Sequence, residues 1–332
     1  MFLDKISGIG LHACKLLKAA SPESRLFLVA RNDEKAHYAM KQVQAVVDEN
    51  SQSSGEIIPM VCDHSCLSSV QSFCKELRKR LCNVGERNGE SSLRGIDVLC
   101  LNAAVLLGED SEAQFTKDDI ELTFQTNHLA PFLIANLTFD LLNRGGRVVV
   151  TTSGLQAFSS FENFQGALTA ETGLVRKKFR MICRGNFDYK KSYAVSKLCN
   201  VAFCLGLNNR LKTKGVVAVC FTPGLIPSSG LFRHQKRWRE TVLMKQAVGM
   251  DETEEWGGSV LAWMALADEA GKQGGAYWRA PFGISKRGGK IPDDLFCAPI
   301  NEEAKDPENI EKLWSISSEL VGIPSGVITI DS

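Results

Sequence analysis

The chain alternates short, uninterrupted apolar runs with longer stretches in which apolar residues recur at helical spacing. The apolar runs cover residues 25–30, 56–62, 97–102, 147–153, 216–222 and 275–278. The helical stretches cover residues 8–19, 33–49, 66–82, 116–139, 190–213, 251–268 and 307–321. Strands that are apolar throughout are typical of a parallel sheet covered on both faces. The alternation therefore predicts an α/β fold, a doubly wound parallel sheet with helices on both faces.

Two long connections interrupt this alternation, at residues 154–189 and 223–250. Connections of this length in a compact domain are usually functional loops, such as lids or binding loops. The 332 residues, 44% of them hydrophobic, suit one large core. We therefore expect a single domain over residues 1–332, with the two connections as substrate-side insertions.

The composition argues against several classes of function. A net charge of +1 at pH 7 argues against nucleic acid as the main partner. No apolar run is long enough to span a bilayer. The eleven cysteines are irregularly spaced, with no paired CxxC motif and no cluster with histidine, so we expect reduced thiols and no metal site. Reduced cysteines fit a compartment such as the cytosol or the plastid stroma.

Candidate binding residues follow the predicted strands, because ligands of such sheets bind at the carboxyl ends of the strands. They are Ser7, Gly8, Ile9 and Gly10 at the first helix, Asn102, Ala103 and Ala104 after the third apolar run, Ser153 after the fourth, and Pro223 and Gly224 after the fifth. Small residues let a ligand approach the backbone, and a glycine-rich helix start can hold a pyrophosphate. Each signal is weak alone, and their order carries the prediction.

Tyr193 and Lys197 stand four residues apart in a segment predicted to be helical. Residues at this spacing are neighbours on one helix face. A lysine ammonium beside a phenol favours the phenolate, so we expect Lys197 to lower the pKa of Tyr193 from its ordinary value of about 10. Such a tyrosine can exchange a proton near neutral pH. The alternative is a surface tyrosine packed on a lysine stem.

In this order the motifs resemble those of the short-chain dehydrogenase/reductase family. The shared motifs are "SGIG" (7–10), Asp63 after a strand, "NAA" (102–104), "TNHLAPF" with Asn127, Ser153, the Tyr193–Lys197 pair and "PG" (223–224). The resemblance is strongest to the branch of light-dependent protochlorophyllide oxidoreductases, through "LNAAV", "SYAVSKLCN", "PGLIPSSGLFRH", "GGAYW" and "EKLWSISSELVG". It covers essentially the whole chain and implies a Rossmann-like NAD(P)-binding domain.

The resemblance implies a role for each matching residue. Tyr193 would donate a proton to the substrate, and Lys197 would lower the pKa of Tyr193 and bind the nicotinamide ribose. Ser153 would orient the substrate or the tyrosine, and Asn127 would hold a water of the proton relay. The cofactor would contact Ser7, Gly8, Ile9, Gly10, Asp63, Asn102, Ala103, Ala104, Pro223 and Gly224, and the substrate would contact Leu225 and Phe232.

The residue after the second family strand bears on the choice of cofactor. An acidic residue at this point binds the ribose 2′-hydroxyl of NAD. Here it is Arg31, whose guanidinium suits a 2′-phosphate, with Lys35 as a second cation. Asp33 is interpreted as the cap of the following helix. We therefore expect NADPH rather than NADH; the alternative is that Arg31 only faces solvent.

The amino-terminal segment departs from the family pattern. The family opens with a central strand and a glycine-rich turn, whereas this chain begins "MFLDKISGIG", with Asp4 in place of the first glycine. A sheet cannot leave its centre unpaired, since buried backbone groups would lose their hydrogen bonds. We therefore expect that the N-terminal strand is missing from this sequence and that the true start lies upstream. The alternative is a degenerate protein that binds the cofactor weakly.

The resemblance implies light-dependent reduction of protochlorophyllide to chlorophyllide, with a hydride from NADPH and a proton from Tyr193. Two departures, Leu225 in place of the usual cysteine and "NHLAPF" in place of "NHLGHF", favour an alternative. This alternative is a dark NADPH-dependent carbonyl reductase or alcohol dehydrogenase that acts on an apolar, retinoid-like substrate. A second alternative, a non-catalytic nucleotide-binding protein, is supported only by the amino-terminal departure.

The basic run "RKKFR" (176–180) is a candidate contact for a substrate carboxylate or an anionic membrane surface, although such runs are more often solvated. We expect a small apolar substrate, a tetrapyrrole if the resemblance to the light-dependent branch holds, and no nucleic acid. Peripheral membrane contact and the oligomeric state stay open. The location would be the plastid if that resemblance holds, and the cytoplasm otherwise.

Overall fold

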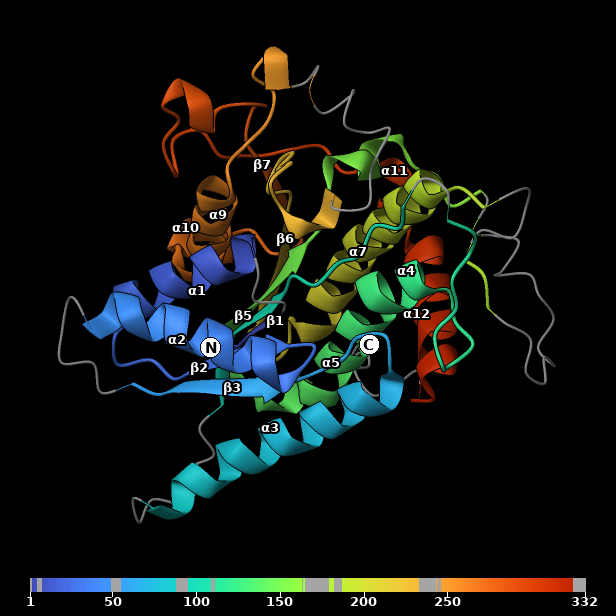
Figure 1. Cartoon of the computed structure of the whole chain (residues 1–332). Helices are drawn as coiled ribbons and strands as arrows, with labels where there is room; N and C mark the ends of the chain where they lie inside the picture. The colour runs from blue at the N-terminus through green and yellow to red at the C-terminus, as the bar shows by residue number, and fades with distance from the viewer. Residues whose placement is uncertain are drawn as a thin grey trace.

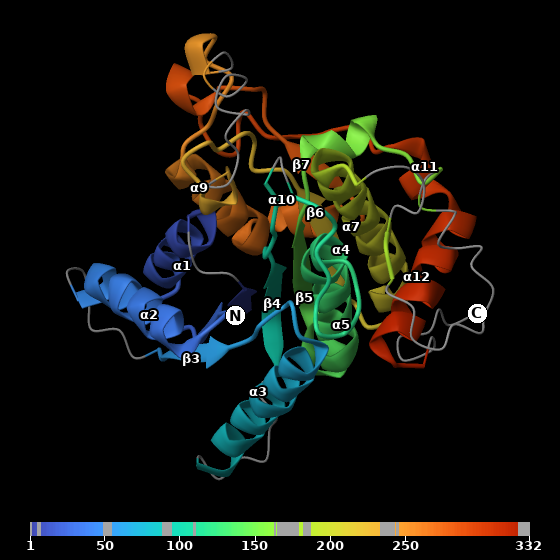
Figure 2. The ribbon, with the colours of Figure 1, turned by 45° about the vertical axis from the view of Figure 1, so that its right-hand side comes forward.

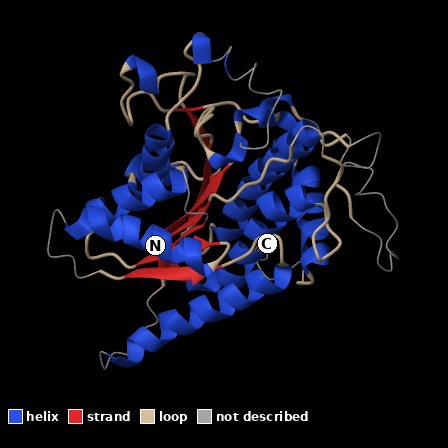
Figure 3. Ribbon diagram, viewed as in Figure 1, coloured by secondary structure: helices blue, strands red, loops and turns tan. Residues whose placement is uncertain are grey.

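The computed structural model of the chain describes residues 2–4, 8–48, 55–87, 95–108, 111–162, 164, 179–181, 187–232, 243 and 246–324. At its centre, the described residues form an eight-stranded sheet in the order β3-β2-β1-β4-β5-β6-β7-β8 (Figures 1 and 3). The strands are β1 (Phe2–Asp4), β2 (Leu26–Ala30), β3 (Ile57–Val61), β4 (Ile96–Leu101), β5 (Leu142–Thr151), β6 (Val217–Phe221), β7 (Tyr277–Arg279) and β8 (Phe296–Cys297). All neighbours are parallel except β7 and β8. The predicted parallel sheet is confirmed.

The strand β1 lies in the middle of this sheet, between β2 and β4. Its residues Phe2–Asp4 pair with residues 27–29 of β2, and its first two residues pair with residues 99–100 of β4. The prediction that the central strand is missing is therefore wrong. These residues pair with the middle of β2 and with the later half of β4, where buried backbone groups need hydrogen-bond partners.

Helices cover both faces of the sheet, as predicted (Figure 2). The longer helices on one face are α1 (Ile9–Ala20), α2 (Asp33–Asp48) and α9 (Glu254–Leu266), followed by the short α10 (Asp268–Lys272). The helices on the other face are α3 (Leu67–Arg87), α5 (Ala130–Thr138), α7 (Tyr189–Leu211) and α12 (Pro307–Val321), with the short α4 (Leu122–Phe124) and α11 (Glu302–Lys305).

Alternate residues of each buried strand join the two halves of the core. In β5, Val148 and Val150 pack on the α3–α5–α7–α12 side, whereas Val149 packs on the α1–α2–α9 side. This alternation follows from the two-residue period of a strand. It explains why the strands read as continuous apolar runs in the sequence.

Side-chain caps define several helix ends. Thr253 Oγ1 accepts a hydrogen bond from Trp256 N at 3.1 Å and caps α9. Asp306 caps α12, which begins with Pro307 and ends at Gly322 in the left-handed conformation. Asn32, rather than the predicted Asp33, caps α2, since its Oδ1 accepts from Lys35 N at 3.0 Å. Asp33 is instead the first residue of that helix.

The predicted helix at 116–139 differs most from the structure. Bridges that join Phe115 to Glu121 and Ile120 to Phe179 precede the helix, which begins at residue 122. A turn of π-helix, Gln125–Leu129, then separates α4 from α5. Apolar periodicity marks a helical region but does not reveal one extra residue in a turn. None of the helices in the described ranges is long and apolar enough to cross a membrane.

Candidate active site

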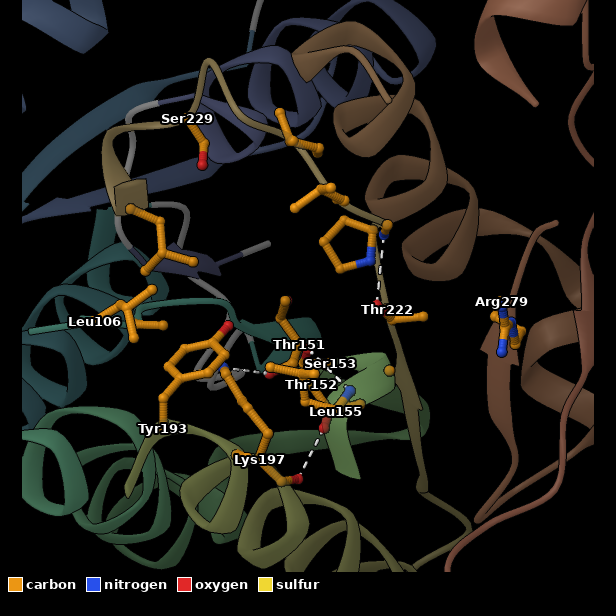
Figure 4. Close-up of a pocket in the computed structure, with 18 of the residues that line it drawn as sticks. Leu106, Thr151, Thr152, Ser153, Leu155, Tyr193, Lys197, Thr222, Ser229 and Arg279 are labelled. Atoms are coloured by element: carbon orange, nitrogen blue, oxygen red, sulfur yellow. Dashed lines mark hydrogen bonds between the residues drawn. The ribbon is translucent and has the colours of Figure 1, made fainter. Parts of the chain in front are cut away.

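A cavity of about 800 Å³ opens at the carboxyl ends of β4, β5, β6 and β7, beside the first turns of α7. This is the edge of the sheet at which the sequence predicts a ligand-binding site. The predicted site residues that line it are Ile9, Asn102, Ala104, Ser153, Tyr193, Lys197, Pro223, Gly224, Leu225 and Phe232. Figure 4 shows Tyr193, Ser153 and Lys197 together on one side of this cavity.

Tyr193 is 7% exposed, and its hydroxyl is hydrogen-bonded with Ser153. Burial raises the pKa of Tyr193 above its ordinary value, and the hydrogen bond with Ser153 opposes part of that rise. The predicted lowering of this pKa is therefore wrong in sign, because the loss of hydration on burial outweighs the opposing hydrogen bond with Ser153. At neutral pH the phenol keeps its proton, so it can donate a proton to a bound molecule.

Lys197 is 1% exposed and lies behind the tyrosine ring, with its Nζ 5.7 Å from the ring centroid. The Nζ donates to Thr151 O at 3.1 Å, and the backbone oxygen of Lys197 accepts from Thr152 Oγ1 at 2.8 Å (Figure 4). These two bonds tie α7 to the end of β5. Lys197 and Tyr193 lie on the same face of α7, as their four-residue spacing predicts.

Ser153 ends the connection from β5 and begins a short 3₁₀ helix, Gly154–Phe158. Its Oγ accepts from Leu155 N at 3.3 Å as the cap of that helix. The same oxygen is engaged with the Tyr193 hydroxyl. The serine thus serves the turn and the site together, because a capping hydroxyl retains one donor and a second lone pair.

Asn127 lies in the π-helix and does not line the cavity. Its side chain accepts from Val105 N at 2.7 Å and donates to Val105 O at 3.1 Å and to Ser196 Oγ at 3.0 Å. Its backbone oxygen accepts from Asn200 Nδ2 at 2.9 Å. Asn127 therefore joins the chain after β4 to α7. The wider turn of a π-helix, which is common at functional sites, lets the asparagine face both elements.

The sequence reasoning missed Glu121, a buried glutamate that is hydrogen-bonded to the first turn of α7. Its carboxylate accepts hydrogen bonds from Met181 N at 3.0 Å and from Ser192 Oγ, next to Tyr193. Burial raises the pKa of Glu121, while these hydrogen bonds and the charge of Arg180 act in the opposite direction. No local pattern marks this glutamate, because its partners lie about 60 and 70 residues away in the chain.

His128 is a second buried residue that the sequence reasoning missed. Its ring lies between Asn200 Oδ1 at 3.3 Å and Ser317 Oγ at 2.9 Å, so it joins the π-helix and α7 to α12. Burial lowers the pKa of His128 to about 3. The ring is neutral at physiological pH and has a structural role.

The remaining predicted cofactor residues lie outside the cavity. Arg31 is exposed after β2, and Gly8, Gly10, Asp63 and Ala103 are not among the cavity-lining residues. The carboxylate of Asp63 accepts from Ser65 N and Ser65 Oγ. Ser7 lies outside the described residues, as do residues 176–178 of the basic run.

Two glycines mark close approaches at this edge of the sheet. Gly224 has a φ of 88°, and a Cβ at this position would lie only 2.5 Å from Glu252 Cγ. Gly8, with φ of 58°, begins α1, and no side chain of the described residues caps that helix by a hydrogen bond. A Cβ on Gly8 would lie 3.6 Å from the carboxylate of Glu254. A negative charge thus stands at the amino end of α1.

The family model for short chain dehydrogenases matches residues 5–166. The chain is 29% identical over 331 residues to the chloroplastic protochlorophyllide reductase of Chlamydomonas reinhardtii, which covers 96% of this chain and 76% of that protein. It is 27% identical over 319 residues to the WW domain-containing oxidoreductase of Gallus gallus, which covers 95% of this chain and 66% of that protein.

Solved structures share the fold at lower identity. A protein from Mycobacterium paratuberculosis superposes with a TM-score of 0.63 at 20% identity, over 97% of this chain and 92% of that one. A short chain dehydrogenase from Burkholderia cenocepacia, solved with NADP, has a TM-score of 0.57 at 19% identity, over 83% of this chain and 93% of that one. In the family model that it matches, in its relatives and in its fold, the chain resembles the short-chain dehydrogenase/reductase family of oxidoreductases.

Proposed function

We propose that the protein is an NADPH-dependent reductase that converts protochlorophyllide to chlorophyllide in light, with Tyr193 as the proton donor. The observation that carries the proposal is a buried, protonated tyrosine beside Ser153, at the wall of a cavity of about 800 Å³. Most of the side chains around this cavity are apolar, which suits a flat, apolar ring system. Relatives named protochlorophyllide reductase support the choice of substrate.

In this proposal the residues of the chain hold and move one proton. Tyr193 keeps its proton at neutral pH until the substrate takes it, and Ser153 holds the hydroxyl in position. Lys197 then stabilises the phenolate that remains, because its ammonium lies on the same helix face. Asn127 holds α7 against the chain after β4 through its hydrogen bonds with Val105 and Ser196. A bound nicotinamide would supply the hydride.

The cofactor proposal rests on the residues around the carboxyl edge. Asn102, Ala104, Pro223 and Gly224 line the cavity beside Tyr193 and fit a nicotinamide riboside in size. Arg31, exposed after β2, favours the 2′-phosphate of NADPH. The carboxylate of Glu254 opposes a phosphate at the amino end of α1, so we expect binding there to be weaker than the fold allows.

The location and the domain organisation belong to the same proposal. A plastid location is supported by relatives whose names describe them as chloroplastic. We also propose that the residues act as one domain, with the connections at 154–189 and 223–250 on the substrate side. Leu225, Phe232 and the 3₁₀ helix Gly230–Phe232 would form the apolar wall against the pigment.

A dark carbonyl reductase with an apolar substrate is the second candidate. The observation that favours it is Leu225, which lines the cavity where the resemblance calls for a cysteine. The same tyrosine, serine and lysine would serve this reaction. The similarity to WW domain-containing oxidoreductases shows that the likeness is not confined to pigment reductases.

The deciding experiment mixes the full chain with NADPH and protochlorophyllide in the dark and then illuminates the sample. We expect a red shift of the pigment absorption only after illumination, and none with Tyr193→Phe. The second candidate would be favoured if the pigment binds without conversion and the protein oxidises NADPH in the dark with an apolar carbonyl compound as the substrate. Absence of NADPH binding would indicate a protein without this catalytic function.

A further inference from the structure

Arg279 is the last residue of β7, and its side chain lines the cavity at the carboxyl edge of the sheet. Figure 4 shows it at the end of its strand, on the side of the cavity away from Tyr193. The strand β7 is held in place by β6 on one side and by β8, through the pair Arg279–Phe296, on the other. The arginine therefore projects from a strand that is paired on both sides.

The positive charge of Arg279 has no carboxylate partner among the residues that the structure describes. Among the described residues, its Nε donates to the neighbouring Ala280 O, at 3.4 Å, and its guanidinium lies 4.8 Å from the ring centroid of Phe282. Other arginines pair with acids: Arg78 with Asp140 at 2.6 Å, and Arg210 with Glu311 at 2.6 Å. A partly buried guanidinium without a counter-ion is costly, which favours an anion from outside the chain.

The acidic residue on the cavity wall is already engaged. Glu252 Oε1 accepts from Ile284 N, and Oε2 accepts from Ser285 N, each at 3.0 Å. Lys190 and Lys191, on the first turn of α7, add two positive charges to the rim of the same cavity. The rim is therefore positive overall.

The walls between these charges are apolar. They include Leu106, Leu155, Leu231, Phe232, Pro281 and Phe282. A cavity with apolar walls and a cationic rim matches a molecule that is apolar in its body and carries one anionic group at its edge. Such a ligand would bury its apolar surface and leave its charge beside the guanidinium.

We propose that the substrate is an apolar carboxylic acid and that Arg279 binds its carboxylate, with two parallel N–H···O bonds. The carboxylate end is then held at β7, and the reacting carbon faces Tyr193 on the opposite wall. This inference rests on the proposed function in placing the reaction at Tyr193. Planar guanidinium and carboxylate groups match in geometry, so the contact fixes orientation as well as charge.

The test compares an acid with its own methyl ester, in wild type and in Arg279→Gln. The first pair is protochlorophyllide and its methyl ester, with KM and kcat measured under illumination. We expect Arg279→Gln to raise KM for the acid roughly tenfold or more, with little change for the ester and little change in kcat. Arg279→Lys should keep part of the KM difference between acid and ester. The control Arg80→Gln removes one positive charge from α3 instead, and its KM and kcat should equal those of wild type.

Binding measurements keep the test independent of turnover. Trp256 lines the cavity, so quenching of tryptophan fluorescence reports binding of the same pair, and of retinoic acid and methyl retinoate as a second pair. Preference for the acid that is lost in Arg279→Gln supports the inference even if no pigment is converted, in which case only the proposed reaction fails. Equal affinity for acid and ester in wild type, or equal losses for both in the variant, would overturn the inference.

Discussion

The two ends of the proposed cofactor site are built differently. At the ends of β5 and β6, Tyr193 and Lys197 are buried and held by hydrogen bonds to Ser153 and Thr151. At the amino end of α1, no side chain of the described residues caps the helix, Gly8 lies near the carboxylate of Glu254, and Arg31 is exposed. The proposed reacting end is therefore held in place by hydrogen bonds, whereas the proposed phosphate end combines a negative charge, Glu254, with a positive one, Arg31. The difference predicts that chemistry and cofactor affinity respond to separate sets of substitutions.

The largest expected effect is on the reacting end. Tyr193→Phe removes the proton donor and should lower kcat by about 10²–10⁴-fold, measured as pigment conversion after illumination. The affinity for NADPH should stay the same, because the ring remains. Tyr38→Phe, at an exposed tyrosine of α2, is the matched control and should behave as wild type. Undiminished turnover in Tyr193→Phe would remove the tyrosine from the mechanism.

The next effect concerns the support of the reacting end. Glu121→Ala leaves Met181 N and Ser192 Oγ without their acceptor and should lower the free energy of unfolding by about 1–3 kcal/mol, measured with urea. The exposed Glu76→Ala on α3 should cost less. A loss no larger than that of the control would show that Glu121 does not support α7.

The same residue predicts a pH dependence. Because its pKa is raised on folding, Glu121 binds a proton more tightly in the folded protein than in the unfolded chain. Its contribution is fully present below the unfolded pKa of about 4.3 and is lost as the pH rises through the folded pKa. Glu121→Gln should therefore flatten the change in unfolding free energy over that window. An unchanged pH profile would contradict the raised pKa.

A smaller effect is expected at the phosphate end. Arg31→Glu should weaken NADPH binding roughly tenfold and NADH binding less, because only NADPH carries the 2′-phosphate. Fluorescence titration with both cofactors measures the difference, and Arg80→Glu on α3 controls for net charge. Equal losses for the two cofactors would mean that Arg31 does not read the phosphate.

The smallest expected effect sharpens the contrast most directly. Glu254→Gln removes the carboxylate beside Gly8 and should tighten NADPH binding about two- to fivefold, as expected for one charge at a helix end. Glu255→Gln is the neighbouring control, since that carboxylate pairs with His12 at 3.6 Å instead. If both variants bind NADPH as wild type does, the phosphate end is not limited by Glu254.

The sequence by itself determined the parallel sheet apart from β1, the helices on its two faces and part of the set of residues at its carboxyl edge. Strands buried on both faces must be apolar throughout, and a four-residue spacing must place Tyr193 and Lys197 on one helix face. Both are local consequences of backbone geometry, so they are readable along the chain. The order of motifs then located Ser153 and the "PG" turn beside them.

Only the tertiary structure decided the energetics and the distant contacts. The pKa of Tyr193 rises instead of falling, because burial is a property of the packed fold and not of the four-residue spacing. Glu121 and Arg279 could not be found in the sequence, since each matters through elements far away in the chain. The short β1 completes the sheet because β2 and β4 lie on either side of it, a circumstance that no local pattern encodes.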